Sequence, residues 1–454
     1  MPDLLRIARR TISLAGALAL AAAVTPAPAQ QASPVRLSLG EAVAIAAERS
    51  AGVEVARMRA DQADARVRQE RADILPNLSA AALESGRTFN TASFGLDFKG
   101  PNGESFFDPR GQVEGPVHTL DIRAHVTQPL LDLGAVQRIR AARSAADASD
   151  ADTDAASELA AANAAAAYLR ALRAEATVDA RRADSTLARE LLAIAEEQVR
   201  AGVGVALDVT RARAQAAQIR AQLIAAENDR SRATLDLQRA LSLPVDSPII
   251  LTDSLTGLSM DVATDEARDI ARALGARPEL RAIDAQVESI ERSAKSARME
   301  RFPTVSAFAD DGPFAKNGGK YLPTYTWGLQ LSMPIFDGFR REARVEEQSA
   351  RKREFDARRR DLRQQISLDV RGAEIDIASS REQLTAARER LSLAEQELAQ
   401  ARERFRAGVA GNADVVTASL ALNAARTLVV DALSGFHSAR IALARAQGAA
   451  RTIR

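Results

Sequence analysis

The side chains best placed to do chemistry lie in a motif that the chain contains twice. Asp208 and Asp414 stand at the same distance after a glycine in the segments 197–212 and 403–418, which are identical at half of their positions. A carboxylate in this position can accept backbone N–H bonds at the start of a following helix. It can also favour cations if copies of it meet around a pore. Both roles are electrostatic, and they are compatible.

Few residues remain for other chemistry. The 454 residues include no cysteine and only three histidines, so disulfides, thiol catalysis and zinc ribbons are excluded. His118 and His125 lie an odd number of residues apart on one expected strand and therefore face opposite sides. The 61 basic residues balance the 60 acidic ones, which argues against a nucleic-acid partner. We expect no enzyme activity, no cofactor and no metal.

The beginning of the chain is typical of an export signal. Basic residues at positions 6–10 precede an apolar run at 14–24, and small residues at 27–29 suit a signal peptidase. We therefore expect residues 1–29 to be a signal peptide, and the mature protein to be periplasmic or in the outer membrane. Without a cysteine, the mature chain cannot carry a lipid on an N-terminal cysteine.

The duplication extends over the whole mature chain. The segment 127–132 matches 332–337, and 74–80 matches 301–307, each pair sharing a proline at the same place. We predict two structural repeats of the same plan. Their bounds are 30–241 and 265–446, with a linker at 242–264 and a tail at 447–454.

Each repeat contains one long helix and a returning helix. In the second repeat, six large apolar residues from Val370 to Phe405 recur every seven positions, and small residues follow each of them three positions later. This heptad seam is typical of a coiled coil in which helices approach closely. We predict long helices at 135–200 and 339–406, each on the order of 100 Å long. Tip turns at 201–207 and 407–413 lead to return helices at 208–241 and 414–446.

Two strands are expected before each long helix, at 77–90, 117–130, 304–311 and 324–335. The clearest alternation of apolar and polar residues lies at 325–333, which is long enough to cross a bilayer as a tilted strand. The residues expected to face lipid are Tyr325, Trp327, Leu329, Leu331, Met333, Leu120, Ile122 and Val126. The alternative is a soluble, half-buried sheet. If the strands enter a membrane, four cannot close a barrel, so several chains must pool them.

At this point the chain resembles the TolC-type outer-membrane efflux proteins. The resemblance rests on the two G-x5-D-V turns, the stretches Q-P-L-L-D-L-G at 128–134 and S-M-P-I-F-D-G at 332–338, and R-P-E-L at 277–280. L-S-L-G-E-A at 37–42 resembles the family's opening. The likeness covers essentially everything after the signal peptide.

The resemblance implies a mainly α fold with a small β part. Three chains give four strands each to one outer-membrane β-barrel of 12 strands, and their antiparallel coiled coils form an α-barrel across the periplasm. A belt of short helices draws on 37–60, 242–280 and the chain after Gln447. The implied partners are two further copies of the chain, outer-membrane lipid, a periplasmic adaptor (membrane fusion) protein, and an inner-membrane pump or ABC transporter. The duct itself is passive, and it serves efflux of small molecules or secretion of polypeptide.

The functional residues implied by the resemblance lie at the periplasmic tip. Gate candidates are Asp208, Asp414, Phe405 and Thr417. Candidates for adaptor docking are Arg200, Ala201, Gly202, Val203, Arg406, Ala407, Gly408 and Val409. The chain departs from the family pattern at Ala410, where a basic gating residue is expected, and at Thr417, where a second acidic one is expected. The usual set of inter-coil bonds is therefore not available here.

Two other protein classes compete with the channel. A periplasmic adaptor shares long helical hairpins, but it usually has one hairpin inserted within β domains, whereas this chain has two hairpins with strands before each. A soluble structural coiled coil would leave the alternating segment 325–333 unexplained.

Overall fold

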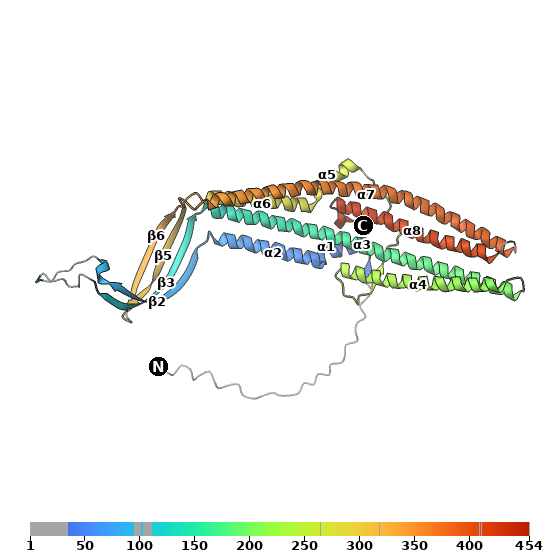
Figure 1. The fold of residues 1–454 in the computed structure, drawn as a ribbon, viewed down its shortest axis with the longest axis horizontal. Coiled ribbons are helices and arrows are strands. Elements are labelled where there is room, and N and C mark those ends of the chain that lie inside the picture. Colours follow the sequence, from blue (N-terminus) through green and yellow to red (C-terminus); the bar gives the residue numbers. More distant parts are fainter. Residues whose placement is uncertain are drawn as a thin grey trace, which may run out of the picture.

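The computed structural model describes residues 35–94, 101–102, 111–263, 265–316, 318–407, 409 and 411–453, and the expected signal peptide lies outside them. The molecule is elongated, with a β-sheet at one end and long helices running away from it (Figure 1). The chain runs from the sheet to the opposite end twice, once in each repeat, and each time it turns back through a helical hairpin.

The sheet has four antiparallel strands. They are β2 (Asn77–Asn90), β3 (Val113–Leu131), β5 (Thr304–Lys316) and β6 (Leu322–Ser332), and they lie side by side in that order. The central β3–β5 pair joins the two repeats. Strands β2 and β6 therefore form the outer edges of the sheet, one from each repeat.

Strand β5 continues to Lys316, past the expected end at residue 311. Gly312 and Pro313 lie beyond that expected end, but both belong to the strand. A Cβ atom at Gly312 would lie 1.9 Å from the carbonyl oxygen of Ile122 on β3. Glycine here permits a close approach of two strands, which is a recognised use of glycine within a sheet.

The long helices are α3 (Leu133–Arg200) and α7 (Arg340–Arg406), and they return as α4 (Ala206–Ala240) and α8 (Asn412–Ala446). Shorter helices precede them: α1 (Leu39–Arg49) and α2 (Ala51–Ala72) in the first repeat, and α5 (Glu266–Ala276) and α6 (Pro278–Met299) in the second. In the half near the sheet, the neighbouring helices are α2, α3, α6 and α7. In the half near the tips, they are α4, α3, α8 and α7.

The matched segments 127–132 and 332–337 each end in an aspartate, and these two aspartates lie at the starts of the long helices. Asp132 is the N-cap of α3 and accepts a hydrogen bond from the backbone N–H of Ala135 at 2.8 Å. Asp337 accepts the backbone N–H of Arg341 at 3.2 Å and its Nε at 2.8 Å. A side-chain acceptor satisfies backbone donors that the first helical turn leaves unpaired. The motif therefore marks the change from strand to helix in each repeat.

The main apolar core lies at the middle of the helical part. There α1, the C-terminal 3-10 helix (Ala450–Thr452) and the short parallel pair β1 (Val35–Leu37) and β4 (Ile249–Leu251) pack against α3. The hydroxyl oxygen of buried Tyr168 lies 2.9 Å from Leu37 O and 2.9 Å from Asp253 Oδ2, two acceptors for its single proton. Burial raises the pKa of Tyr168 above its ordinary value.

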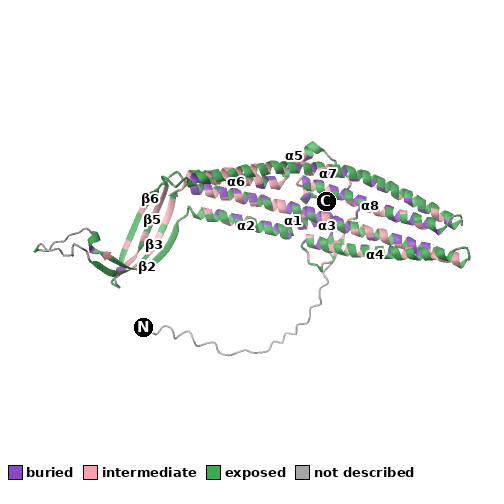
Figure 2. Cartoon of the chain, viewed as in Figure 1, coloured by how far each residue is buried: buried purple, intermediate pink, exposed green. Residues whose placement is uncertain are grey.

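Outside this core the helices bury only narrow stripes, as the alternation of buried and exposed turns in Figure 2 shows. The buried stripe of α7 includes Val370, Ile377, Leu384 and Leu398, as the heptad pattern predicts. Helix α8 is the only described helix whose length and composition would suit a membrane span, and 33% of its most apolar stretch is buried. Its neighbours are α7 and α3.

Candidate functional site

The end of the first hairpin is built around Gly202. Helix α3 ends at Arg200, Gly202 has φ 74°, and the backbone N–H groups of Val203 and Gly204 donate to Gln198 O at 3.0 and 2.9 Å. A Cβ atom at Gly202 would contact nothing within 4 Å. Glycine is therefore needed here for its left-handed conformation rather than for space. Val203 is 79% exposed at the tip.

The second hairpin ends in the same way. Helix α7 stops at Arg406, its C-cap is Ala407, and the N–H of Val409 donates to Arg404 O at 3.1 Å. Val409 is exposed, like its counterpart Val203. Gly408 and Ala410 lie outside the described residues. The adaptor-docking candidates that the structure describes thus form two equivalent exposed ends.

Each tip also carries the same ion pair. Arg200 lies 2.6 Å from Glu197, and Arg406 lies 3.0 Å from Glu403. All four side chains are largely exposed, so each pair contributes less than about 1 kcal/mol to stability. The pairs contribute to the charge pattern of the tip but little to the stability of the hairpin.

Asp208 and Asp414 lie in the first turn of α4 and α8, respectively, and neither helix has a side-chain cap. The N-cap residues are Val205 and Gly411, so the capping role considered from sequence is not the one observed. Asp208 lies 3.8 Å from Arg211 of its own helix. A negative charge in the first helical turn is favoured by the helix dipole. Both carboxylates therefore lie where they complement the positive end of a helix dipole.

The other gate candidates have different surroundings. Phe405 is buried in an apolar cluster between the hairpins, whose other members include Leu187, Leu191, Leu398, Val415 and Leu422. The hydroxyl of Thr417 donates to Ala413 O within α8 at 2.9 Å.

Asn412 is a tip residue that was not identified from sequence. Its side chain is 1% exposed, and its Nδ2 donates to the carbonyl oxygen of Asp208 at 3.0 Å, which ties α8 to α4. Its Oδ1 is buried and has no hydrogen-bond partner in the described part of the chain. The corresponding residue of the first repeat is Ala206. This difference between the repeats was the only signal in the sequence.

A second unpredicted contact lies further up the same two hairpins. Asp184 on α3 has no exposed surface and lies 3.0 Å from Arg181 and 2.8 Å from Arg426 on α8. Arg181 also donates to Thr427 Oγ1 at 2.7 Å. The first and second repeats are thus joined by a buried carboxylate between two arginines.

The sheet has one apolar face and one polar face. The register places Val126 opposite Ala309 and Ala309 opposite Trp327, so the predicted lipid-facing residues of β3 and β6 share one face. The other residues of this apolar face include Leu78, Ala80, Ala82, Leu120, Ile122, Val305, Ala307, Tyr325, Leu329 and Leu331. Glu84, His118, Gln128 and Asp311 are polar exceptions on this face. Met333 lies just beyond β6 and is exposed.

The polar face carries hydrogen-bonded and charged groups. His125 Nδ1 lies 2.5 Å from Asp310, and Arg123 bonds to Asp121 at 2.8 Å and to Thr324 at 3.1 Å. Tyr325 and Trp327 on the apolar face are 76% and 74% exposed, and no described element covers them. A sheet with an uncovered apolar face and a polar face of paired charges is typical of transmembrane β-strands. In such strands one face contacts lipid and the other faces a polar interior.

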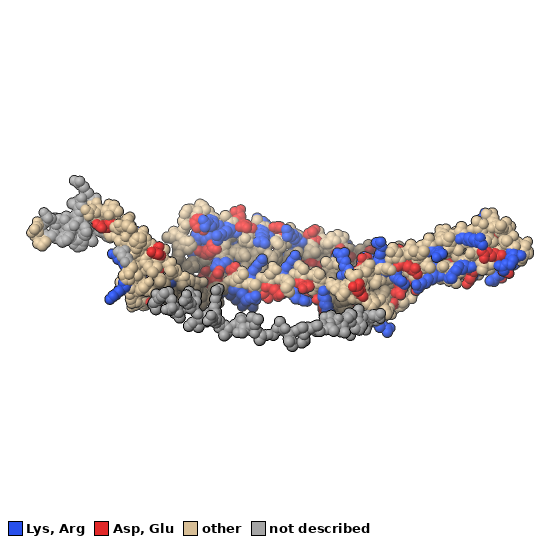
Figure 3. Space-filling model, turned by 90° about the horizontal axis from the view of Figure 1, so that it is seen from below, with Lys and Arg blue, Asp and Glu red and all other residues tan. Residues whose placement is uncertain are grey.

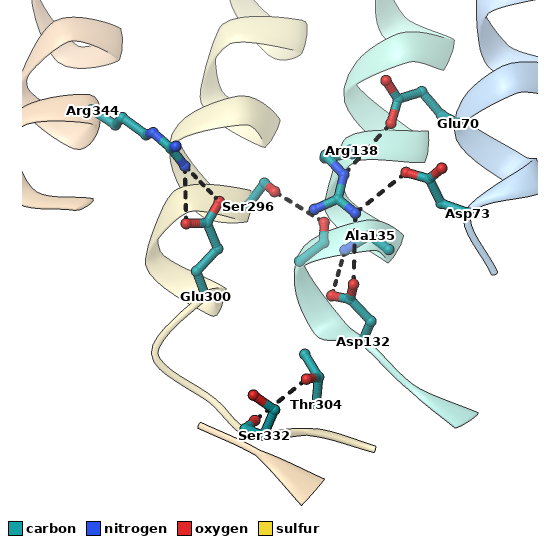
Figure 4. A network of polar contacts seen from close by, with 11 residues as sticks. Glu70, Asp73, Asp132, Ala135, Arg138, Ser296, Glu300, Thr304, Ser332 and Arg344 are labelled. Carbon is teal, nitrogen blue, oxygen red and sulfur yellow. Dashed lines mark hydrogen bonds and ion pairs between the residues drawn. The ribbon is translucent and has the colours of Figure 1, made fainter. Parts of the chain in front are cut away.

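A polar network links neighbouring helices at the end that lies next to the sheet (Figure 4). Arg138 on α3 lies 3.5–3.6 Å from three carboxylates, those of Glu70, Asp73 and Asp132. In the second repeat, Arg344 bonds to Glu300 at 3.0 Å. These contacts tie the end of α2 to the start of α3 in the first repeat, and the end of α6 to α7 in the second.

Basic and acidic side chains are interspersed along the face shown in Figure 3. Among the described residues, no group of three or more His, Cys, Asp or Glu side chains could hold a metal ion.

Comparison with solved structures supports this architecture. The chain is similar to a membrane protein from Pseudomonas aeruginosa, with a TM-score of 0.75, 21% identity, and 90% and 92% coverage of the two chains. It is similar to the outer membrane protein VceC from Vibrio cholerae, with a TM-score of 0.71, 19% identity, and 90% and 96% coverage. For the CmeC outer membrane channel of Campylobacter jejuni, the values are 0.72, 18%, and 91% and 86%. These similarities show a shared fold.

At the level of sequence, no curated protein matches the chain. A family model described as outer membrane efflux protein matches residues 42–242 and 270–449, one segment in each repeat and well over half of the chain. The chain therefore belongs to the outer membrane efflux protein family.

Proposed function

We propose that the protein is the subunit of a passive export duct that crosses the outer membrane and the periplasm. The observation that carries this proposal is the two-faced sheet, whose four strands share one apolar face while the edges of β2 and β6 have no strand partner among the described residues. Unpaired strand edges are not tolerated in hydrocarbon. The edges must pair with other copies of the same chain.

The helical part, like the sheet, has two outer sides, and each of them continues an edge of the sheet. On one side lie β2, α2 and α4 of the first repeat, and on the other lie β6 and α7 of the second. Both sides expose apolar residues, namely Val55, Met58, Ile224 and Leu235 on one, and Leu368, Ile375 and Leu393 on the other. When one side of a subunit binds the different opposite side of the next copy, the subunits form a closed ring if the rotations between neighbours add up to a full turn. We infer a head-to-tail ring.

Barrel size and the family resemblance together favour three copies. A barrel of about eight strands has an interior filled by side chains. Two copies would reach only that size, whereas three supply the 12 strands expected from the resemblance and leave an opening. The polar face of the sheet would then line the lumen, and the apolar face would contact lipid.

The partners proposed for the duct act at its ends. The exposed tips at Val203 and Val409 are the surfaces that a periplasmic adaptor would engage, and an inner-membrane pump or ABC transporter would supply energy. Export into the periplasm would use residues 1–29 as a signal peptide. The competing adaptor function does not account for the two-faced sheet or the two open edges.

The natural absence of cysteine allows a direct test of the ring. One cysteine is introduced on the exposed edge of β2 and another is moved along β6, and outer membranes are oxidised. In a ring of three, each single variant stays monomeric on denaturing gels, while a correctly registered double variant gives covalent dimers and trimers and nothing larger. Cross-linking by a single variant, or an open ladder beyond the trimer, would contradict the proposal.

A further inference from the structure

Helix α5 lies on α7 near the middle of the molecule (Figure 1). One face of α5 is buried in this contact. Ala273 has no exposed surface, and Ile270 and Leu274 pack against an apolar cluster that includes Val370 and Ile377 of α7. The other side of α5 is exposed. The helix is therefore attached to the rest of the fold along one face.

Both ends of α5 are held by arginines that donate to backbone carbonyl groups. Before the helix, Arg440 of α8 donates to Ser259 O at 2.6 Å, and Arg381 of α7 donates to Val262 O at 3.2 Å. After the helix, Arg277 donates to the last carbonyl oxygen of α8 at 3.4 Å. These bonds fix the two ends of the segment, so the middle of α5 depends on its own contact with α7.

That contact includes a pair of carboxyl groups. Asp269 of α5 is 7% exposed, and its side chain is hydrogen-bonded to that of Glu374 on α7. Glu374 Oε1 is buried and has no hydrogen-bond partner in the described part of the chain. An ionised carboxylate only accepts hydrogen bonds, so two carboxyl groups bond to each other only when one of them carries a proton. The contact between α5 and α7 therefore contains a proton.

The charges around the pair favour retention of this proton. Asp265 and Glu266, at the start of α5, add negative charge near Glu374. Arg371 of α7 lies 2.7 Å from Glu266 and pairs with it. Burial, then the bond to Asp269, then the neighbouring negative charges raise the pKa of Glu374 above its ordinary value. The side chains that α6 and α8 add to the apolar cluster are Leu280, Phe436, Ala439, Leu443 and Ala446.

We propose that α5 is a proton-controlled flap, which packs on α7 while Glu374 and Asp269 share a proton and loosens when both are ionised. The inference concerns the chain itself and does not depend on the proposed duct. Two carboxylates in direct contact repel each other, and only the apolar face of α5 then opposes their separation. Loosening would uncover Val370 and Ile377, while the arginines at both ends limit how far α5 moves.

The direction of the pH dependence follows from the raised pKa of Glu374. The docked arrangement keeps a proton that the loosened arrangement releases. Docking is therefore strongest below the ordinary glutamate pKa of 4.5, and it weakens as the pH rises through the raised value. A single proton changes the equilibrium between the two arrangements by at most about tenfold per pH unit.

The absence of cysteine allows one introduced thiol to report on the flap. Ala273→Cys places the thiol on the buried face of α5, and Ala271→Cys places it on the exposed side of the same helix. Maleimide labelling rates of the purified full-length protein are measured between pH 5 and pH 8. The rate of the Ala273 variant is divided by that of the Ala271 variant, so that the pH dependence of the thiol chemistry cancels. We expect this ratio to rise several-fold from pH 5 to pH 8.

Two charge variants, each combined with both reporters, test whether the carboxyl pair is the cause. Glu374→Gln can donate to Asp269 without a shared proton, so the ratio should stay low at every pH. Asp376→Asn is the matched control, because it removes an exposed negative charge of α7 and should keep the full rise. A flat ratio without these changes, or a rise that survives Glu374→Gln, would overturn the flap.

Two further measurements keep the outcome decisive. Circular dichroism shows whether each variant is folded, and if Glu374→Gln is not, Asp269→Asn makes the same test from the side of α5. A protein that forms neither a trimer on unheated gels nor pores in lipid bilayers would overturn the duct. The labelling ratio would still decide the flap, because it is measured within one chain.

Discussion

The carboxylate of Asp184 on α3 lies 2.8 Å from the guanidinium of Arg426 on α8, and Asp184 is completely buried. The two residues belong to different repeats, so their pairing exists only in the folded chain. Arg181 completes the group from the preceding turn of α3. A charge buried in a thinly packed coiled coil makes the position of α8 relative to α3 sensitive to a single side chain.

Substitution of this carboxylate should cost considerable stability. We expect Asp184→Asn to lower the free energy of unfolding by about 3 kcal/mol, the lower end for breaking a buried pair, because both arginines keep some access to solvent. Asp179→Asn is the control, since its ion pair with Arg182 is exposed and should be worth less than about 1 kcal/mol. Thermal unfolding in detergent checks both, and equal losses would argue against a special role for Asp184.

Neighbouring residues of β6 test which face of the sheet meets lipid. Leu329→Arg places a charge on the apolar face and should cost about 2–4 kcal/mol if that position lies near the middle of the bilayer. Gln330→Arg changes the polar face and should be tolerated. The measurement is the amount of heat-modifiable trimer in outer-membrane fractions. If Gln330→Arg is the more harmful of the two, the assigned faces are reversed.

The hairpin end at Gly202 should be sensitive to a bulky residue. Gly202→Val forces a β-branched side chain into a left-handed backbone conformation, at a cost of about 1–2 kcal/mol, and adds bulk at the proposed docking surface. We expect a stable trimer that reproduces the export defect of a gene deletion in the native host. Gly275→Val on α5 is the control, because that glycine has open space and an ordinary helical backbone. Normal export by the Gly202 variant would argue against docking at the tip.

The central core should weaken in mild acid because of His437. Burial lowers the pKa of His437, and the nearby Arg440 charge lowers it further. The folded state therefore binds its proton less readily than the unfolded state. The stability contributed by neutral His437 is complete above about pH 6.5 and is lost as the pH falls through the lowered folded-state pKa.

The expected slope in that window is at most about 1.4 kcal/mol per pH unit. His437→Gln is uncharged at every pH and keeps a donor for Leu255 O, so it should remove this part of the pH dependence. Thermal unfolding of both proteins between pH 5 and pH 8 gives the difference. Parallel curves would show that His437 does not titrate in this way.

Periodic features of the chain could be predicted well from sequence. The heptads from Val370 to Phe405 follow from the geometry of one helix, and the observed α7 ends at Arg406. The alternation at Tyr325 and Trp327 likewise indicated the exposed face of β6. Each of these signals is local, because spacing along the chain equals spacing along an element.

Contacts between distant segments could not be found in this way. Asp184 looks like an ordinary polar residue of a coiled coil until Arg426 is brought beside it. Asn412 lies four residues after Gly408, in a turn where polar residues are common, and only its bond to Asp208 O gives it a role. Gly312 appeared to end a strand, although its missing side chain serves the approach of β3.

The two open sheet edges also have a kinetic meaning. One copy alone exposes both β2 and β6, and a pair of copies would still leave one edge of each kind unmatched. If three copies close the ring, insertion into the membrane requires the third copy. No smaller assembly would then form a pore. A cell would then be protected against leakage while the duct is being made, and the rate of assembly would rise steeply with the concentration of newly exported chains.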